Sequence, residues 1–260
     1  MRKVVILCGC LACALFLSAC AKAPYTGRNQ LMIISQQEEL ALGKKTANDV
    51  LKTEKRDTTS ENSKAVTRVG KNIAASAGRD DFQWEFNTIL KDDMPNAFCL
   101  PGGKVFVYTG IFKYIKNDAE LAAVMGHEIG HAIARHGAER VSTALAAQTG
   151  AAVGMIALSG QDLSPATRAA MGAAFGVGVN VGVILPFSRV QEYEADRVGL
   201  ILMAKAGYDP HAALEFWRAF AQQPGNKPPE FLSTHPASEN RIEAIKELIP
   251  EAMQYYKKPQ

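Results

Sequence analysis

Cysteine is scarce in the body of this 260-residue chain. Of the five cysteines only Cys99 lies beyond residue 20, so no intramolecular disulfide framework can hold the fold together. A marked excess of one charge is also missing, since the formal net charge is only +3. Nucleic-acid-binding domains usually carry a strong basic excess, so we expect no nucleic-acid partner. The hydrophobic fraction of 47% is sufficient for a globular core.

A hydrophobic run long enough to cross a bilayer is also lacking at the N-terminus. The apolar segment from Val4 to Leu17 follows the basic residues Arg2 and Lys3 and precedes small residues, and it is short for a membrane span. This order of a basic, an apolar and a small-residue region is typical of a secretory signal peptide. We therefore expect residues 1–19 to be a signal peptide that is not part of the fold.

The end of that segment, Leu17-Ser18-Ala19-Cys20, resembles a bacterial lipobox. The resemblance implies cleavage before Cys20, lipidation of Cys20 with diacylglycerol and an acyl chain such as palmitate, and anchoring to a membrane. Residues 20–34 would then be a lipidated tether. Ala21 stands where an aspartate often signals inner-membrane retention, which favours the periplasmic face of an outer membrane. An ordinary secretory signal or a short anchor helix is the alternative.

The rest of the chain predicts an α+β domain over residues 35–260, predominantly helical and with a small sheet. Apolar spacing and capping residues predict helices at about 40–51, 66–76, 118–136, 190–206, 210–222 and 238–249. Phe82, Trp84 and Phe86 alternate with polar residues, and Lys104–Tyr108 follows a Pro-Gly-Gly turn, which predicts two strands and a hairpin. Residues 144–185, rich in Ala, Gly and Val, predict a helical hairpin that packs inside the fold, and a membrane-dipping or lid-like element is the alternative.

Two histidines carry the clearest chemical signal. His127 and His131 are four residues apart in the predicted helix 118–136, so both imidazoles can reach one metal ion from the same face. Glu128 lies beside the first histidine, where it can act on a metal-bound water as the catalytic base. With five histidines in the chain, a chance His-Glu-x-x-His match has a probability on the order of half a per cent.

A catalytic zinc ion needs a third protein ligand, and the segment Glu192–Asp196 offers carboxylates. Glu192 and Asp196 share a helix face, which favours Glu192 as the ligand and Asp196 as the acceptor for a ligand histidine's second N–H. Glu194 is expected to point away, in a solvated or structural role. Without the histidine pair, the same segment would be interpreted as an exposed acidic helix face.

These motifs, with Pro101–Gly110 before the metal-binding helix, resemble metallopeptidase family 48, which includes the CAAX prenyl proteases and HtpX-like proteases. The similarity runs from about Ser35 to Ile249 and is closest to small envelope lipoprotein peptidases. It implies a zincin fold of the gluzincin type. It also implies one Zn²⁺ ion held by His127, His131 and Glu192, with Glu128 as catalytic glutamate.

The resemblance also gives roles to two further segments. His235, followed by Pro236 and by Arg241 six residues on, matches a family element near the metal, where the histidine could steady the oxyanion or occupy the open coordination position. Lys104, Val105, Phe106 and Val107 are expected to bind substrate as an edge strand, as such segments are thought to do in relatives. His136 and His211 are expected to be structural, His136 as the last residue of its helix, and Cys99 a buried free thiol.

The sequence therefore predicts a zinc-dependent endopeptidase of the bacterial cell envelope that degrades unfolded, misfolded or damaged proteins. Two other classes remain open. One is a zinc-containing periplasmic chaperone or assembly factor for outer-membrane proteins, working with envelope assembly machinery. The other is a structural envelope lipoprotein with an accidental motif.

Overall fold

A computed structural model of the protein describes residues 20–159, 188–222 and 230–257. The described residues divide into two compact units, one made of residues 20–36 with 137–159 and the other of residues 37–136 with 188–222 and 230–257. All the residues predicted to bind metal or act in catalysis belong to the second unit. Residues 1–19, predicted to be a signal peptide, and the second arm of the helical hairpin predicted at 144–185 lie outside the described residues.

The first unit contains a short hairpin and a long helix. Strand β1 (Cys20–Lys22) pairs with the antiparallel strand β2 (Asn29–Leu31) within the range predicted to be a tether. Helix α5 (His136–Ser159) contributes Glu139, which forms an ion pair with Arg28 at 2.6 Å, and Ser142, whose hydroxyl accepts from the Ile33 N–H at 2.9 Å. The hairpin is therefore attached to this helix by specific polar contacts, and Cys20 is exposed.

The second unit is built around a four-stranded sheet in the order β3 (Arg56–Asp57), β4 (Glu85–Ile89), β6 (Lys104–Tyr108) and β5 (Ala97–Leu100). Strand β6 is parallel to β4 and antiparallel to β5. The predicted strand at Lys104–Tyr108 is confirmed. The two predicted strands correspond to β4 and β6, which are parallel neighbours and form no hairpin. The hairpin partner of β6 is β5, which the sequence did not predict.

The aromatic alternation before β4 was only partly a strand signal. The strand starts at Glu85, so Phe82 and Trp84 precede it. The Phe82 N–H bonds to the Arg79 carbonyl in a turn, and the Trp84 ring lies where a side chain on Gly103 would be, 2.6 Å from an ideal Cβ. These rings alternate because they pack against the domain, not because their backbone is part of the sheet.

Strand β6 lies inside the sheet and is buried on both faces. Val105 and Val107 belong to the main core, whereas Phe106 and Tyr108 pack with Ala47 of helix α2 (Gln36–Thr53). The prediction that Lys104–Val107 form a substrate-binding edge strand is therefore wrong, because both backbone edges of β6 are already paired. Lys104 is 4% exposed, and its Nζ pairs with Glu85 Oε1 at 2.7 Å. The outer strand on this side is β5.

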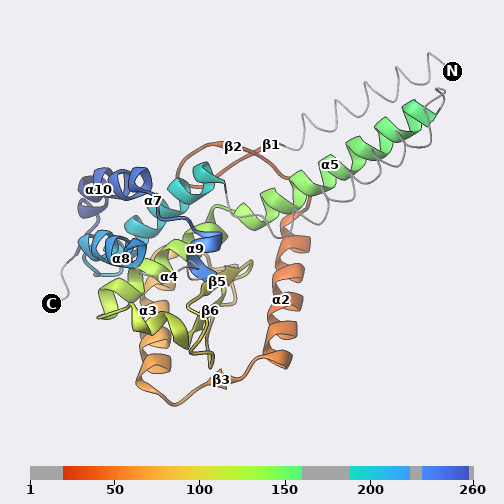
Figure 1. The fold of residues 1–260 in the computed structure, drawn as a ribbon. Helices are drawn as coiled ribbons and strands as arrows, with labels where there is room; N and C mark the ends of the chain where they lie inside the picture. Colours follow the sequence, from red (N-terminus) through yellow and green to blue (C-terminus); the bar gives the residue numbers. More distant parts are fainter. Residues whose placement is uncertain (1–19, 160–187, 223–229, 258–260) are drawn as a thin grey trace. The chain divides into compact units, whose positions relative to one another are not determined.

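The helices of this unit pack against the sheet and against one another. Helix α4 (Asp118–Ile133) packs against α3 (Glu61–Ala77), α7 (Arg189–Lys205), α8 (His211–Ala221) and strand β5, and α10 (Glu239–Met253) packs against α7 and α8 (Figure 1). The 3₁₀ helix η1 (Thr109–Lys113) and the short helix α9 (Glu230–Thr234) complete the unit. The predominantly helical α+β class is confirmed.

Capping side chains set several helix starts. In the first turns of α3, α4, α7 and α10, a backbone N–H donates to the side-chain oxygen of a capping residue. These capping residues are Ser60, Asn117, Ser188 and Ser238. Gly78 ends α3 with φ of 62°, as predicted. Two predicted ends were wrong. Helix α4 stops at Ile133, and α10 continues through Pro250 to Met253, where Ala252 is buried.

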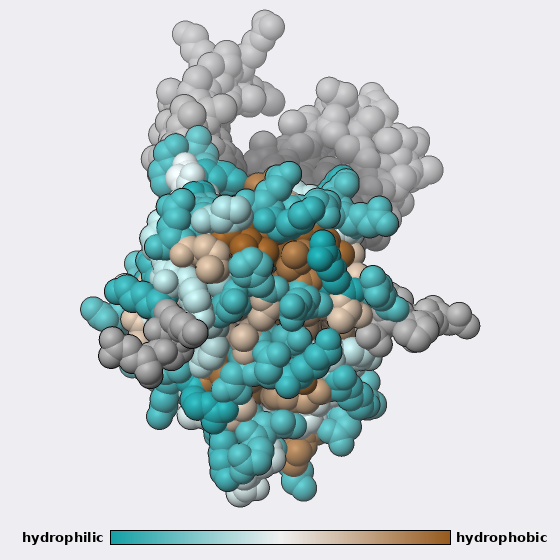
Figure 2. Space-filling view, turned by 90° about the vertical axis from the view of Figure 1, so that its left-hand side faces the viewer, coloured by the Kyte–Doolittle hydropathy of each residue, from teal (hydrophilic) through white to brown (hydrophobic). Residues whose placement is uncertain are grey.

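No helix among the described ranges is long and apolar enough to span a bilayer. Figure 2 shows a face on which hydrophilic residues cover most of the described surface, and apolar residues appear in smaller patches between them.

Candidate metal centre

The two histidines of the motif face the same point from helix α4. Because they are one helical turn apart, their rings lie on one face, and their Nε2 atoms are 3.1 Å apart. His127 is 1% exposed and His131 is 3% exposed. Two imidazole nitrogens therefore converge inside the protein, away from bulk water.

Helix α7 brings a carboxylate to the same point. Glu192 Oε1 lies 3.3 Å from His131 Nε2, and Glu192 Oε2 lies 3.5 Å from His127 Nε2. His235, in the loop after α9, joins them with its Nδ1 3.1 Å from Glu192 Oε1 and 3.1 Å from His127 Nε2. Each of the four residues offers one ligand atom, and these atoms all lie within 4.8 Å of one another.

Asp196 and Arg241 orient His127 from behind. Asp196 Oδ1 lies 2.8 Å from His127 Nδ1, so the carboxylate can hold the proton there and leave the Nε2 lone pair facing Glu192. Arg241 donates to Asp196 through two bonds of 2.7 and 2.8 Å, reaches Glu192 Oε2 at 2.6 Å, and lies over the Trp217 ring. The sequence pointed to Arg241 only by its spacing from His235, and gave it no role.

The electrostatics favour neutral histidines and an ionised carboxylate. Burial lowers the pKa of His127, and it lowers that of His131 well below its usual value. Burial alone would raise the pKa of Glu192, but its hydrogen bonds with His131 and His235 and the charge of Arg241 hold it far below its usual range. At neutral pH the cluster therefore offers lone pairs and one negative charge.

Glu128 lies beside this cluster and has the properties of a catalytic base. It is 2% exposed, and burial raises its pKa to about 7. His235 Nε2 lies 3.4 Å from Glu128 Oε1, and this oxygen accepts no hydrogen bond from any residue in the described ranges. A buried carboxylate oxygen without such a bond is expected where a water or substrate group completes the site.

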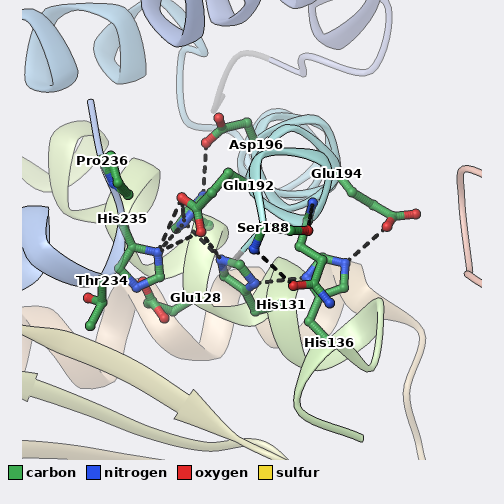
Figure 3. Close-up of polar contacts among 12 residues, drawn as sticks. Glu128, His131, His136, Ser188, Glu192, Glu194, Asp196, Thr234, His235 and Pro236 are labelled. Carbon is green, nitrogen blue, oxygen red and sulfur yellow. Dashed lines mark hydrogen bonds and ion pairs between the residues drawn. The ribbon is translucent and has the colours of Figure 1, made fainter. Parts of the chain in front are cut away.

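The donor set fits a catalytic zinc ion. Two histidine nitrogens and one carboxylate oxygen are the protein ligands of one common class of such sites, with a fourth position left for water. His235 lies close enough to share or fill that fourth position. Figure 3 shows Glu192 and His235 approaching each other, with Glu128 below them.

The sequence model of peptidase family M48 matches residues 60–249 of this chain. This range includes Glu128 and the four residues of the ligand cluster. The chain belongs to peptidase family M48. Peptidases of this family use a metal ion, which agrees with the donor set described above.

Named relatives agree with the M48 assignment. The chain is 42% identical over 189 residues to the mitochondrial metalloendopeptidase OMA1 of Schizosaccharomyces pombe, covering 72% of this chain and 53% of that protein. It is 30% identical over 182 residues to the Beta-barrel assembly-enhancing protease of Escherichia coli (strain K12), covering 68% of this chain and 37% of that protein. The chain thus spans about half or less of the length of these two relatives.

Two residues near the metal ligands differ in how well the sequence placed them. Of the solvated or structural role expected for Glu194, the structure excludes the solvated one, because Glu194 is 4% exposed and its Oε2 lies 3.0 Å from His136 Nε2. His136 is not at the end of the metal-binding helix. It begins α5, is fully buried and lies with its Nδ1 2.8 Å from His131 Nδ1. The helical wheel placed Glu194 correctly on another face of α7, but it could not show what covers that face.

Two other residues lie outside the ligand cluster. His211 is exposed and its Nδ1 lies 2.7 Å from Asp209 Oδ1 at the start of α8. Cys99 is half-buried on β5, and burial, aided by the negative charge of Glu128, raises the pKa of its thiol well above the usual value. This interaction places the outer strand of the sheet near the proposed catalytic base.

Proposed function

We propose that this chain is a zinc-dependent endopeptidase of a bacterial cell envelope that cleaves misfolded or damaged proteins. The observation that carries the proposal is the position of Glu128. A buried carboxylate with a pKa of about 7 and a free oxygen lies next to a His-His-Glu cluster that suits zinc.

In the proposed reaction His127, His131 and Glu192 hold the ion. Zinc bound there would polarise the scissile carbonyl and lower the pKa of water. Glu128 accepts a proton from the attacking water and delivers it to the leaving amine, a task suited to a base whose pKa is near neutrality. Its Oε1 accepts no hydrogen bond from another described residue, so this oxygen can accept one from a water.

His235 fits two roles in this reaction. Its Nδ1 faces the ligand atoms at 3.1 Å, so it suits the fourth ligand position, while its Nε2 faces Glu128 at 3.4 Å. A small displacement would free the fourth position and leave an imidazole N–H near the oxyanion of the reacting carbonyl. We propose His235 as a residue that acts at the reacting centre in one of these ways.

The outer edge of β5 replaces β6 as the proposed substrate strand. Tyr108 N–H donates to the Asn96 carbonyl, and Gly103 N–H donates to the Leu100 carbonyl. The carbonyl groups of Asn96 and Leu100 therefore face β6. Backbone groups alternate in direction along an antiparallel strand, which turns those of Cys99 toward the open edge. A substrate paired there would be recognised by its backbone, which suits extended segments of unfolded proteins of varied sequence.

The location in the envelope is supported by the leader segment and by one relative. Leu17-Ser18-Ala19-Cys20 has the pattern of a lipidation site, and Cys20 is exposed at the start of β1. The printed name of the E. coli relative refers to β-barrel assembly, and β-barrels are the spanning proteins of bacterial outer membranes. We propose lipid anchoring through Cys20 to the periplasmic face of the outer membrane, although other relatives are mitochondrial.

Zinc removal tests the proposed activity. The purified protein should contain one zinc ion per chain and cleave an unfolded substrate such as reduced casein. A chelator should abolish cleavage and added zinc should restore it, whereas cleavage by the metal-free protein would contradict the proposal. For the anchor, a Cys20→Ser variant should keep its activity but leave the membrane fraction. Retention of the variant in that fraction would contradict lipidation.

The part of the E. coli relative's name that refers to β-barrel assembly motivates a second proposal, a zinc-containing assembly factor that binds outer-membrane proteins without cutting them. A Glu128→Gln variant separates the two, because it should lose cleavage but keep any ability to prevent aggregation of an unfolded β-barrel protein. Suppression of aggregation by this variant would support the assembly role, and its absence would leave only the peptidase.

A further inference from the structure

A chain of buried polar groups runs from the metal site on the side opposite Asp196. His131 Nδ1 lies 2.8 Å from His136 Nδ1, and His136 Nε2 lies 3.0 Å from Glu194 Oε2. All three residues are at most 4% exposed. Figure 3 shows Glu192 and Glu194 leaving different sides of α7, with His131 and His136 in line between them.

The chemistry of these groups fixes the direction of each hydrogen bond. The carboxylate of Glu194 can only accept, so His136 Nε2 carries a proton and donates it. With the ring proton of His136 on Nε2, its Nδ1 presents a lone pair, so the proton in the short Nδ1–Nδ1 contact comes from His131. His131 therefore has its proton on Nδ1 and a lone pair on Nε2, the nitrogen that faces Glu192 and His127.

The backbone places His136 where it can do this. Helix α4 ends at Ile133, and Arg135 adopts φ of 62°, a left-handed conformation that is uncommon for a residue other than glycine. The Arg135 side chain is held by Glu39, whose Oε2 lies 2.7 Å from Nε. If the helix had continued, His136 would be five residues beyond His131 and off its face. The break turns it back toward His131.

We propose that His136 and Glu194 are positioning residues for the metal ion, which fix the tautomer and the orientation of its ligand His131. The inference rests on the proposed zinc site and adds a second support to it. His127 is oriented by Asp196 and Arg241, whereas His131 is oriented by His136 and Glu194, so each histidine ligand is held by its own buried side chains, which include a carboxylate. Removing such a partner typically weakens metal binding 10–100-fold.

Zinc affinity, measured by competition with a chromophoric chelator, tests these roles without reference to activity. His136→Phe removes both ring nitrogens, and Glu194→Leu removes the acceptor, so each should bind zinc about 10–100-fold more weakly. Glu194→Gln keeps an acceptor oxygen and should lose clearly less. Because Glu194 acts on His131 only through His136, the double variant His136→Phe/Glu194→Leu should bind zinc no more weakly than His136→Phe alone.

A cobalt(II)-substituted protein gives a second readout. The visible absorption bands of cobalt depend on ligand geometry, so they should change in His136→Phe and in Glu194→Leu. In Glu194→Gln they should stay closer to those of the unaltered protein. Ile249→Ala, which opens the core of α10 away from the cluster, controls for simple loss of stability and should retain the affinity and bands of the unaltered protein. Thermal unfolding of all the variants shows whether Ile249→Ala loses as much stability as the others.

The outcomes separate the two proposals. Unaltered zinc affinity in both His136→Phe and Glu194→Leu, additive effects in the double variant, or an equal loss in Ile249→Ala would overturn the roles of His136 and Glu194. Absence of zinc binding by the unaltered protein would instead overturn the proposed function on which those roles rest.

Discussion

Gly130 of helix α4 lies directly against the backbone of Ala195 in helix α7. An ideal Cβ placed on Gly130 would be 2.7 Å from the Ala195 carbonyl oxygen. The two helices therefore approach as closely as their backbones allow, at the level of the metal ligands. This approach lets Glu192 reach both histidines of α4, since its oxygens lie 3.3 and 3.5 Å from their Nε2 atoms.

Gly130→Ala should therefore separate the two helices and weaken the site. We expect a loss of about 1–3 kcal/mol in the free energy of unfolding from overpacking, together with weaker zinc binding. Denaturant unfolding and metal titration measure the two effects. Gly137→Ala is the matched control, because nothing lies within 4 Å of its ideal Cβ. If Gly130→Ala behaved like this control, the close approach would not matter for the site.

Glu192→Ala should remove the third zinc ligand. The variant should retain little zinc after dialysis and should not cleave, because the cluster loses its one carboxylate ligand. Metal analysis of the dialysed protein gives the result. Glu251→Ala removes a carboxylate that pairs with Arg197 at 2.7 Å on the surface, and it should keep its zinc. Full zinc content in Glu192→Ala would assign the third ligand to another residue.

Zinc binding should release a proton from Glu128. With a pKa of about 7, Glu128 is about half protonated at pH 7 in the metal-free protein, and a nearby cation favours the ionised form. Burial lowers the pKa of His127 and His131, so these are already mostly neutral and release few protons. Zinc binding at pH 7 should thus release about half a proton more from the unaltered protein than from Glu128→Gln.

The release can be measured by calorimetry in buffers of different ionisation enthalpy. The difference between the two proteins should grow as the pH falls below 7, where more Glu128 is protonated, and it should vanish well above pH 8. Equal proton release from both proteins at every pH would show that Glu128 does not titrate near neutrality.

Cys99→Pro should impair substrate pairing at the outer edge of β5. Proline removes the N–H that is directed away from β6, so the sheet loses no internal hydrogen bond. We expect cleavage of unfolded substrates to fall, with the change mainly in KM, while zinc content stays constant. Cys99→Ala keeps the N–H and serves as control. Equal cleavage by both variants would remove β5 from substrate binding.

Much of the site could be predicted because its information is local. His127, Glu128 and His131 depend only on helical periodicity, and the spacing of Glu192 and Asp196 gave both a shared face and an order of roles. The structure brings these residues together as that spacing requires. The strand at Lys104–Tyr108 followed from its alternation and its preceding turn.

The rest depended on contacts between distant segments. Sequence patterns could not show that β5 would take the outer position and enclose Lys104–Val107 inside the sheet. The left-handed residue Arg135 breaks a helix that periodicity alone continues to His136, because its conformation depends on packing and on its pairing with Glu39. Glu194 was assigned no function for the same reason, since its partner His136 comes from another helix.

Replacement of Glu128 by glutamine tests the central claim most directly. Glutamine has the same shape but cannot accept the proton, so Glu128→Gln should bind one zinc ion as the unaltered protein does and lose cleavage of unfolded casein by about 10²–10⁴-fold or more. Zinc content and cleavage should be measured on the same preparation. Full zinc content with undiminished cleavage would contradict the role of Glu128 as the base of a zinc-dependent endopeptidase.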